Sequence, residues 1–277
     1  MSLIDRETKL ASSIKVVLMR TTHPGNIGAV ARAMKNMGLN QLALVNPSDC
    51  TNHGEPSNPV QSMEAVRRSS GAKDLLQQAH VYESLEESLA ECHIVIGASA
   101  RSRKMVWPLM NPRDCAELIH KEIFNSPVSK SIKIALMFGQ EASGLTNDEL
   151  QRCHYHVNIP AIADFSSLNL AMAVQLICYE IRMAMLLDTT VDQPHQLTSA
   201  ILSAKDEGWD EELATASNLE SFFIHLEETL INIEFHDAKN PRRLMNRLRR
   251  LFQRAHMDKM EVNILRGILT AVQKQLK

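Results

Sequence analysis

Short apolar runs alternate with amphipathic stretches over the first 187 residues of the chain. Residues 15–20 and 41–45 are rich in β-branched and other apolar side chains, as buried strands are. Between them, residues 27–37 place apolar side chains at helical spacing, and Gly38 ends that pattern. The chain is therefore predicted to open with a β-α-β unit.

The alternation continues further along the chain. Four more strands are predicted, over residues 79–82, 93–97, 133–138 and 156–159. Helices are predicted between them, and one starts after Thr146 because the Thr-x-x-Glu spacing to Glu149 forms a capping box. A long apolar helix over residues 168–187 closes this part. Strands that alternate with helices indicate an α/β fold with a mainly parallel sheet.

The remainder of the chain has a different pattern. Residues 188–203 are rich in Thr, Gln, Pro and Ser, which is typical of a linker. From residue 204 onward no strand is predicted, and helices fit residues 220–233, 241–257 and 258–277. We therefore expect an α/β domain over residues 1–187, a linker over 188–203 and a small all-helical domain over 204–277.

Composition excludes several classes of protein. With 277 residues, 44% of them hydrophobic, and a formal net charge of −2, the chain is neither disordered nor collagen-like. The longest apolar stretch, Leu170–Leu187, is interrupted by Gln175, Glu180 and Arg182, so no membrane span is predicted. The N-terminus lacks the layout of a secretory signal, and a cytoplasmic location is expected.

The five cysteines are widely spaced and form no C-x-x-C pair. This argues against a disulfide framework and against a zinc site. All five are expected to be buried, reduced thiols: Cys50, Cys92, Cys115, Cys153 and Cys178.

The near-zero net charge hides an asymmetry. Residues 205–234 contain one basic and nine acidic side chains, whereas residues 237–277 contain eleven basic and three acidic ones. One interpretation is a helical hairpin whose two arms attract each other. The other is a basic face for phosphates, because six arginines between residues 242 and 254 outnumber the local acids. Both can hold together.

Small and polar residues follow four of the predicted strands, in residues 22–32, 97–103, 137–145 and 158–169. In an open parallel sheet, ligands bind beyond the carboxyl ends of the strands. These segments together predict a ligand cradled by backbone groups of several loops, with Arg and Asn side chains supplying charge-assisted hydrogen bonds.

Single residues in these segments have plainer interpretations as well. Asn26 can cap the helix that follows it, and Gly28 permits a close backbone approach. Arg32 can be a solvated surface arginine, and Ser166 or Ser167 can cap the long helix.

Missing motifs exclude other chemistry. The chain has no G-x-x-x-x-G-K-[ST], which excludes phosphate binding by a Walker loop. It has no G-x-G-x-x-G after the first strand and no carboxylate at the end of the second strand to bind a ribose, so a dinucleotide site, or a methyltransferase site that holds its adenosine ribose in the same way, is disfavoured. No G-x-S-x-G precedes a helix, and His154 and His156 are interpreted as structural because no third ligand is evident. No cysteine lies in residues 22–32, 137–145 or 158–169, so covalent attack on a pyrimidine has no obvious nucleophile.

Three motifs occur in order: Asn26-x-Gly28-x-x-x-Arg32, then Phe138-Gly139-x-Glu141-x-x-Gly144-Leu145, then Ile159-Pro160 with Ser167-Leu168-Asn169. They resemble the three motifs of the SpoU/TrmH group of SPOUT RNA 2′-O-ribose methyltransferases. Finer matches at residues 23–26, 99–103 and 164–169 resemble the TrmJ branch, the tRNA (cytidine/uridine-2′-O)-methyltransferases. The resemblance covers about residues 12–187 and extends to basic stretches at 247–252 and 263–267.

The resemblance implies a fold and a cofactor. Residues 139–187 would thread a deep trefoil knot that binds S-adenosylmethionine, in a homodimer with its active site at the subunit interface. No metal and no membrane are implied. Ala98 stands where the family often has Thr, so only a backbone contact would be kept there. The positions implied to contact the cofactor are Ala98, Ser99, Ala100, Gly139, Ile159, Ser166, Ser167 and Leu168.

Catalytic and RNA-binding roles carry over in the same way. Arg32 would orient a ribose 2′-hydroxyl and stabilise its developing charge, because a guanidinium stays protonated at neutral pH. Asn26, Glu141 and Asn169 would hold Arg32, the loops or the ribose. The implied substrate is C or U at position 32 of the tRNA anticodon loop. The residues implied to contact RNA are Arg101, Arg103, Arg243, Arg247, Arg250 and Arg254.

Three alternatives remain at this point. The same chemistry could act on ribosomal RNA or on another tRNA position, because the motifs define the reaction and not the substrate. The chain could be an RNA-binding knot protein without catalysis, although Arg32, Glu141 and Asn169 are intact. It could also be an α/β protein with a charged helical hairpin and no RNA role.

Overall fold

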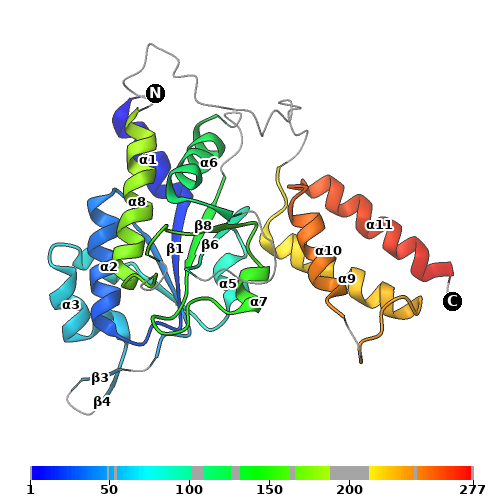
Figure 1. Cartoon of the computed structure of the whole chain (residues 1–277), viewed down its shortest axis with the longest axis horizontal. Coiled ribbons are helices and arrows are strands. Elements are labelled where there is room, and N and C mark those ends of the chain that lie inside the picture. Colours follow the sequence, from blue (N-terminus) through cyan, green and yellow to red (C-terminus); the bar gives the residue numbers. More distant parts are fainter. Residues whose placement is uncertain are drawn as a thin grey trace. The chain divides into compact units, whose positions relative to one another are not determined.

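The computed structural model describes residues 2–48, 50–52, 55–100, 109–125, 132–162, 166–187, 212–239 and 242–275. The chain divides into two compact units. The first comprises Met1–Ala184 with Thr215–Ser217, and the second comprises Met185–Ala214 with Asn218–Lys277. Figure 1 draws both, and each is described below by itself.

The first unit is built on a seven-stranded sheet with the strand order β5-β2-β1-β8-β6-β9-β7. Every pair of neighbouring strands in it is parallel. This confirms the predicted α/β fold. The strands are β1 (Ile14–Met19), β2 (Gln41–Val45), β5 (His80–Tyr82), β6 (Ile94–Ala98), β7 (Leu109–Met110), β8 (Ile134–Phe138) and β9 (Tyr155–Val157).

Helices cover both faces of this sheet (Figure 1), with α2 and α8 on one side and α5 and α7 on the other. A small antiparallel hairpin, β3 (Cys50–Asn52) with β4 (Glu55–Ser57), and a 3-10 turn, η1 (Pro59–Gln61), lead into α3. The helices are α1 (Leu3–Ser13), α2 (Pro24–Asn36), α3 (Met63–Ser69), α4 (Lys73–Gln77), α5 (Leu85–Leu89), α6 (Pro112–Phe124), α7 (Asn147–Gln151) and α8 (Leu170–Leu187).

The six strands expected from the apolar runs are all present, and the capping box of α7 forms as predicted, between Thr146 and Glu149. Helix α2 begins earlier than the periodicity suggested, at Pro24. Its N-cap is His23, whose Nδ1 accepts a hydrogen bond from the backbone NH of Gly25 at 3.1 Å. The interpretation of Asn26 as the cap was therefore wrong. Proline at the first helical position extends the helix because its fixed φ is already helical.

The core lies on both faces of the central strands. Four of the five residues Ile14–Leu18 and all of Ile134–Phe138 are buried, as expected for a parallel sheet covered on two sides. Four of the five cysteines, Cys92, Cys115, Cys153 and Cys178, are buried and form no disulfide, and burial raises the pKa of Cys92 to about 11 and of Cys115 and Cys178 to about 12. They remain thiols at neutral pH.

His154 and His156 are also structural. His154 Nδ1 accepts a hydrogen bond from the backbone NH of Val95 at 3.0 Å, and His156 Nε2 lies 3.0 Å from the carbonyl oxygen of Leu150. In the part of the chain that the structure describes, no group of three or more His, Cys, Asp and Glu side chains is arranged to hold a metal ion.

Helix α8 is long and apolar enough to cross a membrane by length and composition, and 39% of it is buried within the fold. Val174, Ile177 and Ile181 are buried at the i, i+3, i+7 spacing of one helix face. Met172 and Tyr179 on other faces are exposed. The helix therefore covers the sheet with one face and leaves apolar side chains exposed on the others.

Helices α2 and α3 pack closely at Gly28. A Cβ at this position would lie 2.1 Å from the carbonyl oxygen of Ala65 in α3. The close backbone approach expected at Gly28 is therefore made by a neighbouring helix. We expect Gly28→Ala to lower the free energy of unfolding by about 1–3 kcal/mol, because α3 must move away. Urea denaturation would measure it.

Gly71→Ala is the matched control for this substitution. A Cβ at Gly71 would meet no atom within 4 Å, so its effect should stay within about 0.5 kcal/mol. Equal unfolding free energies for Gly28→Ala and the wild type would contradict the packing argument.

The second unit is helical, with α9 (Ala216–Asn232), α10 (Leu244–Gln253) and α11 (Lys259–Gln275). Its core is built around Phe222, Phe223 and Leu226 of α9, against which Phe252 packs edge-on. The three expected helices are present: α9 begins four residues earlier than predicted, and α10 and α11 are shorter than predicted. The predicted linker, residues 188–203, lies outside the described residues.

Candidate active site

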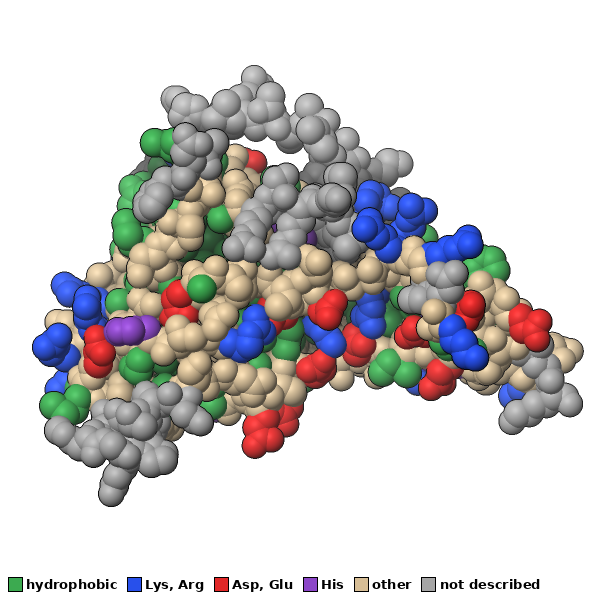
Figure 2. Space-filling model, turned by 60° about the horizontal axis from the view of Figure 1, so that its bottom comes forward, with side chains coloured by type: hydrophobic (Ala, Val, Ile, Leu, Met, Phe, Trp, Pro, Cys, Tyr) green, Lys and Arg blue, Asp and Glu red, His purple; other side chains and the backbone are tan. Residues whose placement is uncertain are grey.

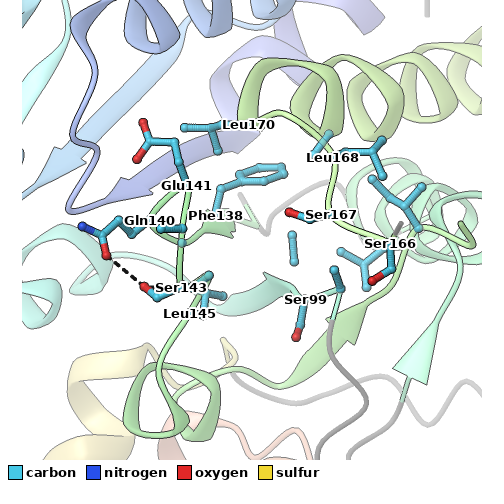
Figure 3. A pocket seen from close by; sticks show the side chains of 18 residues that line it. Ser99, Phe138, Gln140, Glu141, Ser143, Leu145, Ser166, Ser167, Leu168 and Leu170 are labelled. Carbon is cyan, nitrogen blue, oxygen red and sulfur yellow. Dashed lines mark hydrogen bonds between the residues drawn. The ribbon is translucent and has the colours of Figure 1, made fainter. Parts of the chain in front are cut away.

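A pocket of about 220 Å³ opens at the carboxyl ends of β6, β8 and β9 in the first unit (Figure 3). Its walls come from residues 98–100, 138–145, Val157 and Ile159, and, at the start of α8, from residues 166–168, Leu170 and Ala173. This is the edge of the sheet at which the loop motifs predicted a ligand. All eight positions singled out for a cofactor line this pocket: Ala98, Ser99, Ala100, Gly139, Ile159, Ser166, Ser167 and Leu168.

The loop after β8 forms one wall, and it closes on itself. The backbone NH of Gly144 donates to the carbonyl oxygen of Gln140 at 2.7 Å, and Ser143 Oγ donates to Gln140 Oε1 at 2.9 Å (Figure 3). Gly144 has a φ of +69°, and a Cβ at Gly139 would lie 2.0 Å from the backbone of Gly144. Both glycines are therefore required by the turn itself.

Glu141 links this loop to the loop after β1. Its Oε2 accepts hydrogen bonds from the backbone NH and the hydroxyl of Thr22, at 3.1 and 3.0 Å. Its Oε1 accepts from Asn26 Nδ2 at 2.9 Å. Asn26 Oδ1 in turn accepts from Asn169 Nδ2 at 3.1 Å. Three residues from three separate motifs, Asn26, Glu141 and Asn169, thus form one network.

The electrostatics of Glu141 follow from these contacts. Partial burial raises the pKa of its carboxyl, but the hydrogen bonds from Asn26 and Thr22 outweigh burial and leave the pKa below its ordinary value. The carboxylate is ionised at neutral pH and accepts hydrogen bonds only. It therefore orients the Asn26 amide, whose oxygen is left to face Asn169.

Asn169 also begins helix α8. Asn169 lies directly before the first residue of the helix. Its Oδ1 accepts a hydrogen bond from the backbone NH of Ala171, in the first turn, at 3.0 Å. The alternative that Ser166 or Ser167 caps this helix was therefore wrong. Both serines line the pocket instead.

Arg32 stands apart from this network. It lies on the second half of α2, its side chain is exposed, and it does not line the pocket. Within the described ranges it forms no hydrogen bond or ion pair. One copy of the chain does not bring Arg32 together with Glu141 and Asn169.

Other candidate residues lie outside the described ranges. Arg101 and Arg103 fall in residues 101–108, and Asp164 and Phe165 fall in residues 163–165.

The arginines of the second unit divide into two groups. Arg249 forms a two-pronged ion pair with Glu220 of α9, at 2.7 and 2.8 Å, and stacks on the ring of Phe223. In contrast, Arg243, Arg247, Arg250 and Arg254 are exposed or half-exposed and have no ion-pair partner among the residues described. On the face drawn in Figure 2, acidic and basic side chains are interspersed. Attraction between α9 and α10 therefore accounts for the contact of Arg249 with Glu220. The other four arginines leave a basic face that no described carboxylate neutralises.

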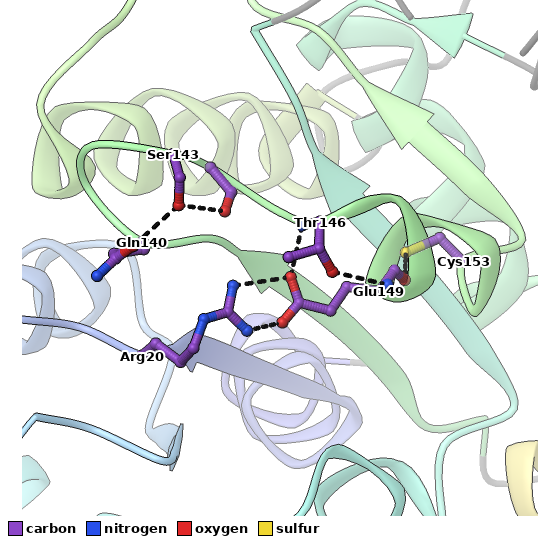
Figure 4. Close-up of polar contacts among 7 residues, drawn as sticks. Arg20, Gln140, Ser143, Thr146, Glu149 and Cys153 are labelled. Atoms are coloured by element: carbon purple, nitrogen blue, oxygen red, sulfur yellow. Dashed lines mark hydrogen bonds and ion pairs between the residues drawn. The ribbon is translucent and has the colours of Figure 1, made fainter.

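Two contacts at this edge were missed by the sequence analysis. Thr22 donates two hydrogen bonds to Glu141, and Arg20 forms an ion pair with Glu149 of α7 (Figure 4). Each joins residues more than 100 positions apart, so no local spacing signals them. Once a parallel sheet is predicted, the pairing of strands β1 and β8 is the feature that would bring these residues together.

Comparison with known proteins identifies the family. Residues 13–179 match the model of the SpoU rRNA methylase family, and residues 217–277 match that of the C-terminal domain of tRNA methyltransferase TrmJ. The chain is 48% identical over 264 residues, 94% of either chain, to the tRNA (cytidine/uridine/adenosine-2′-O-)-methyltransferase TrmJ of Pseudomonas aeruginosa (strain UCBPP-PA14).

Two further relatives match this chain over almost its whole length. The tRNA (cytidine/uridine-2′-O-)-methyltransferase TrmJ of Escherichia coli (strain K12) is 44% identical over 268 residues, covering 97% of this chain and 98% of that one. The crystal structure of TrmJ from Z. mobilis ZM4 superposes with a TM-score of 0.72 at 30% identity, covering 94% of this chain and 98% of that chain. The chain therefore belongs to the SpoU methylase family, among the tRNA 2′-O-methyltransferases of the TrmJ type.

Proposed function

We propose that this chain methylates the ribose 2′-hydroxyl of C or U at position 32 of the tRNA anticodon loop. The observation that carries the proposal is the pocket at the ends of β6, β8 and β9, beside which Asn26, Glu141 and Asn169 form one network. The names of the relatives support a tRNA ribose as substrate, and one of them includes adenosine. In a loop, both the base and the ribose 2′-hydroxyl of a nucleotide are accessible to a protein.

The residues present fit S-adenosylmethionine, the methyl donor of SpoU methyltransferases. Phe138, Leu145 and Leu170 give the pocket apolar walls that suit an adenine ring. Ser99 and Gln140 add polar groups that suit a ribose and an amino acid. When bound, this cofactor supplies an electrophilic methyl group on a sulfonium.

The side chains of the protein then position and activate the ribose. Arg32 would orient the 2′-hydroxyl and stabilise the negative charge that its oxygen gains as the proton leaves. Asn26 is held by the ionised Glu141 and is bonded to Asn169. These contacts keep the loops in the positions that bind the ribose. The cofactor would be held by two serines and by the backbone of six further residues that line the pocket: Ser166 and Ser167, and Ala98, Ser99, Ala100, Gly139, Ile159 and Leu168.

The proposal includes a homodimer with the active site at the subunit interface. Arg32 is exposed and away from the pocket of its own chain, and α8 leaves apolar side chains exposed, as expected if a second copy covers them. It also includes the trefoil knot over residues 139–187. Light scattering that gave the mass of a monomer at working concentration would contradict the dimer.

The remaining parts of the proposal concern RNA. Residues 204–277 form the RNA-binding extension, joined by a linker over residues 188–203 to the methyltransferase domain of residues 1–187. Arg101, Arg103 and the exposed arginines of the extension contact the tRNA backbone. A cytoplasmic location follows from a tRNA substrate.

The experiment is transfer of labelled methyl from S-adenosylmethionine to bulk tRNA that lacks native modifications. We expect a 2′-O-methyl nucleotide at position 32, located by nuclease digestion and mass spectrometry. Transfer to ribosomal RNA only, or to a different tRNA nucleotide, would keep the reaction and overturn the substrate. Cofactor binding without transfer to any RNA would indicate a catalytically inactive RNA-binding protein.

A further inference from the structure

Arg20 and Thr22, which follow β1, hold the two ends of the 139–145 loop that forms one wall of the pocket. Thr22 binds Glu141 near the start of the loop, through two hydrogen bonds of 3.0 and 3.1 Å. Arg20 binds Glu149 beyond its end, with Nη1 facing Oε1 and Nη2 lying 3.1 Å from Oε2 (Figure 4). The second contact is a two-pronged ion pair, the strongest geometry available to an arginine and a carboxylate.

Glu149 depends on Arg20 because its side chain is only 8% exposed. Besides Arg20, its Oε2 accepts a hydrogen bond from the backbone NH of Thr146 at 2.7 Å, within the capping box of α7. Burial raises the pKa of Glu149, and the bonds from Arg20 and Thr146 more than offset it, so the carboxylate is charged. Without Arg20 it would be a buried charge with no counter-ion, which is strongly unfavourable.

Arg20 is itself fixed by its backbone. Its φ is +48°, a left-handed conformation that is uncommon for arginine, and its NH donates to the carbonyl oxygen of Val45 at 2.8 Å. Thr21 continues this attachment, because its carbonyl oxygen accepts from the NH of Ser48 at 3.0 Å. Residues 20 and 21 are therefore tied to the end of β2 and to the segment that follows it, and can serve as a rigid anchor.

The loop between the two anchors is rigid enough to transmit a displacement. Residues 139–145 are closed by the Gly144–Gln140 and Ser143–Gln140 hydrogen bonds, and Leu145 is 1% exposed. All seven of these residues line the pocket, whereas Arg20 and Glu149 do not. A shift of α7 and Thr146 would therefore move a wall of the pocket as one piece.

We propose that Arg20 and Glu149 are positioning residues for the cofactor: their ion pair fixes the end of the 139–145 loop and so shapes the wall against which S-adenosylmethionine binds. The inference rests on the proposed function for the identity of the ligand. It assigns a role to two residues that lie outside the three motifs and do not touch the pocket.

Calorimetric titration of the full-length protein with S-adenosylmethionine tests this. We expect Arg20→Gln to raise the Kd and the KM for the cofactor by about tenfold, because the loop loses one of its two anchors. The Kd for tRNA should stay within about twofold, because the phosphate contacts are made elsewhere. Arg20→Lys keeps the charge and should recover part of the loss.

Arg152→Gln is the matched control. Arg152 pairs with Glu86 at 2.5 Å, and its side chain is 30% exposed, close to the 33% of Arg20. Neither Arg152 nor Glu86 lines the pocket. Both variants lose an ion pair and some thermal stability, but the control should bind the cofactor as the wild type does.

The outcomes separate the inference from the proposed function. Failure of the wild type to bind S-adenosylmethionine would overturn the proposed function. Binding by the wild type with an unchanged Kd in Arg20→Gln, or an equal rise in Arg152→Gln, would overturn the inference alone. If Arg20→Gln does not fold, the double variant Arg20→Gln/Glu149→Gln removes both charges together. A rise in its Kd for S-adenosylmethionine would support the inference, and an unchanged Kd would overturn it.

Discussion

Arg32→Ala is expected to lower kcat for tRNA methylation by about 10³-fold, the size of loss seen when one donor to a developing oxyanion is removed. The 2′-hydroxyl is a weak nucleophile, and its oxygen gains negative charge as its proton leaves to a base or to water. A protonated guanidinium stabilises that charge more in the transition state than in the ground state. The KM values for S-adenosylmethionine and tRNA should therefore change by no more than about threefold.

The structure makes this substitution easy to interpret. Arg32 is exposed and forms no hydrogen bond or ion pair with any described part of its own chain. Its removal should leave the melting temperature unchanged, so a loss of rate cannot be attributed to unfolding. Single-turnover methyl transfer with saturating cofactor and tRNA measures the chemical step directly.

Two variants complete the test of Arg32. Arg32→Lys keeps a charge but loses the planar fork, and should fall between the wild type and alanine. Arg68→Ala removes another exposed arginine, from helix α3, and should leave kcat unaltered. Retention of more than about a tenth of the wild-type kcat by Arg32→Ala would show that Arg32 is only a solvated surface arginine.

Local pattern was sufficient to predict the elements of this fold. Apolar runs such as 41–45 and 133–138 are buried on both faces of a parallel sheet, and this is why their positions could be predicted within one or two residues. The two-residue strand β7 and the hairpin of β3 and β4 are too short to carry a periodic signal. The start of α2 was placed too late because the helical spacing of apolar side chains begins only at Ile27, whereas the helix begins at Pro24.

The site was predictable as a set of loops but not as a network. The ends of parallel strands share one edge, so the motifs after β6, β8 and β9 had to converge there. Which side chain bonds to which depends on tertiary packing, and Asn26 illustrates this. Its short polar side chain suggested a cap, yet in the structure it bridges Glu141 and Asn169. Thr22 and Arg20 were missed for the same reason.

The second large effect concerns the basic face of α10. We expect replacement of Arg243, Arg247, Arg250 and Arg254 together by Gln to weaken tRNA binding by about 10²-fold at moderate salt. The slope of log K against log salt should flatten by about 3, because four phosphate contacts no longer release counter-ions. Filter binding or fluorescence anisotropy over a range of salt concentrations measures both quantities. The cofactor Kd of the variant should equal that of the wild type.

Helical geometry explains why Arg247, Arg250 and Arg254 act as a group. Their spacing of 3 and 4 residues keeps them within about 60° of one another around the helix axis, and Arg243 lies directly before the helix as its N-cap residue. Met245, Leu248 and Phe252 point the other way and pack against the core of the second unit. The strip of charge is therefore directed away from the core, and it can follow a phosphate backbone without the helix having to unpack.

Arg249 provides the control that separates a phosphate-binding face from mere positive charge. It lies on the same helix as Arg250, but its guanidinium is held by Glu220 and by the ring of Phe223. Arg250→Gln should weaken tRNA binding and reduce the salt slope by about 0.7, with little change in stability. Arg249→Gln should lower stability and leave the slope near its wild-type value, because its charge is already neutralised by a carboxylate. If both variants reduced the slope equally, long-range attraction by net charge would explain the binding, and the face of α10 would have no specific role.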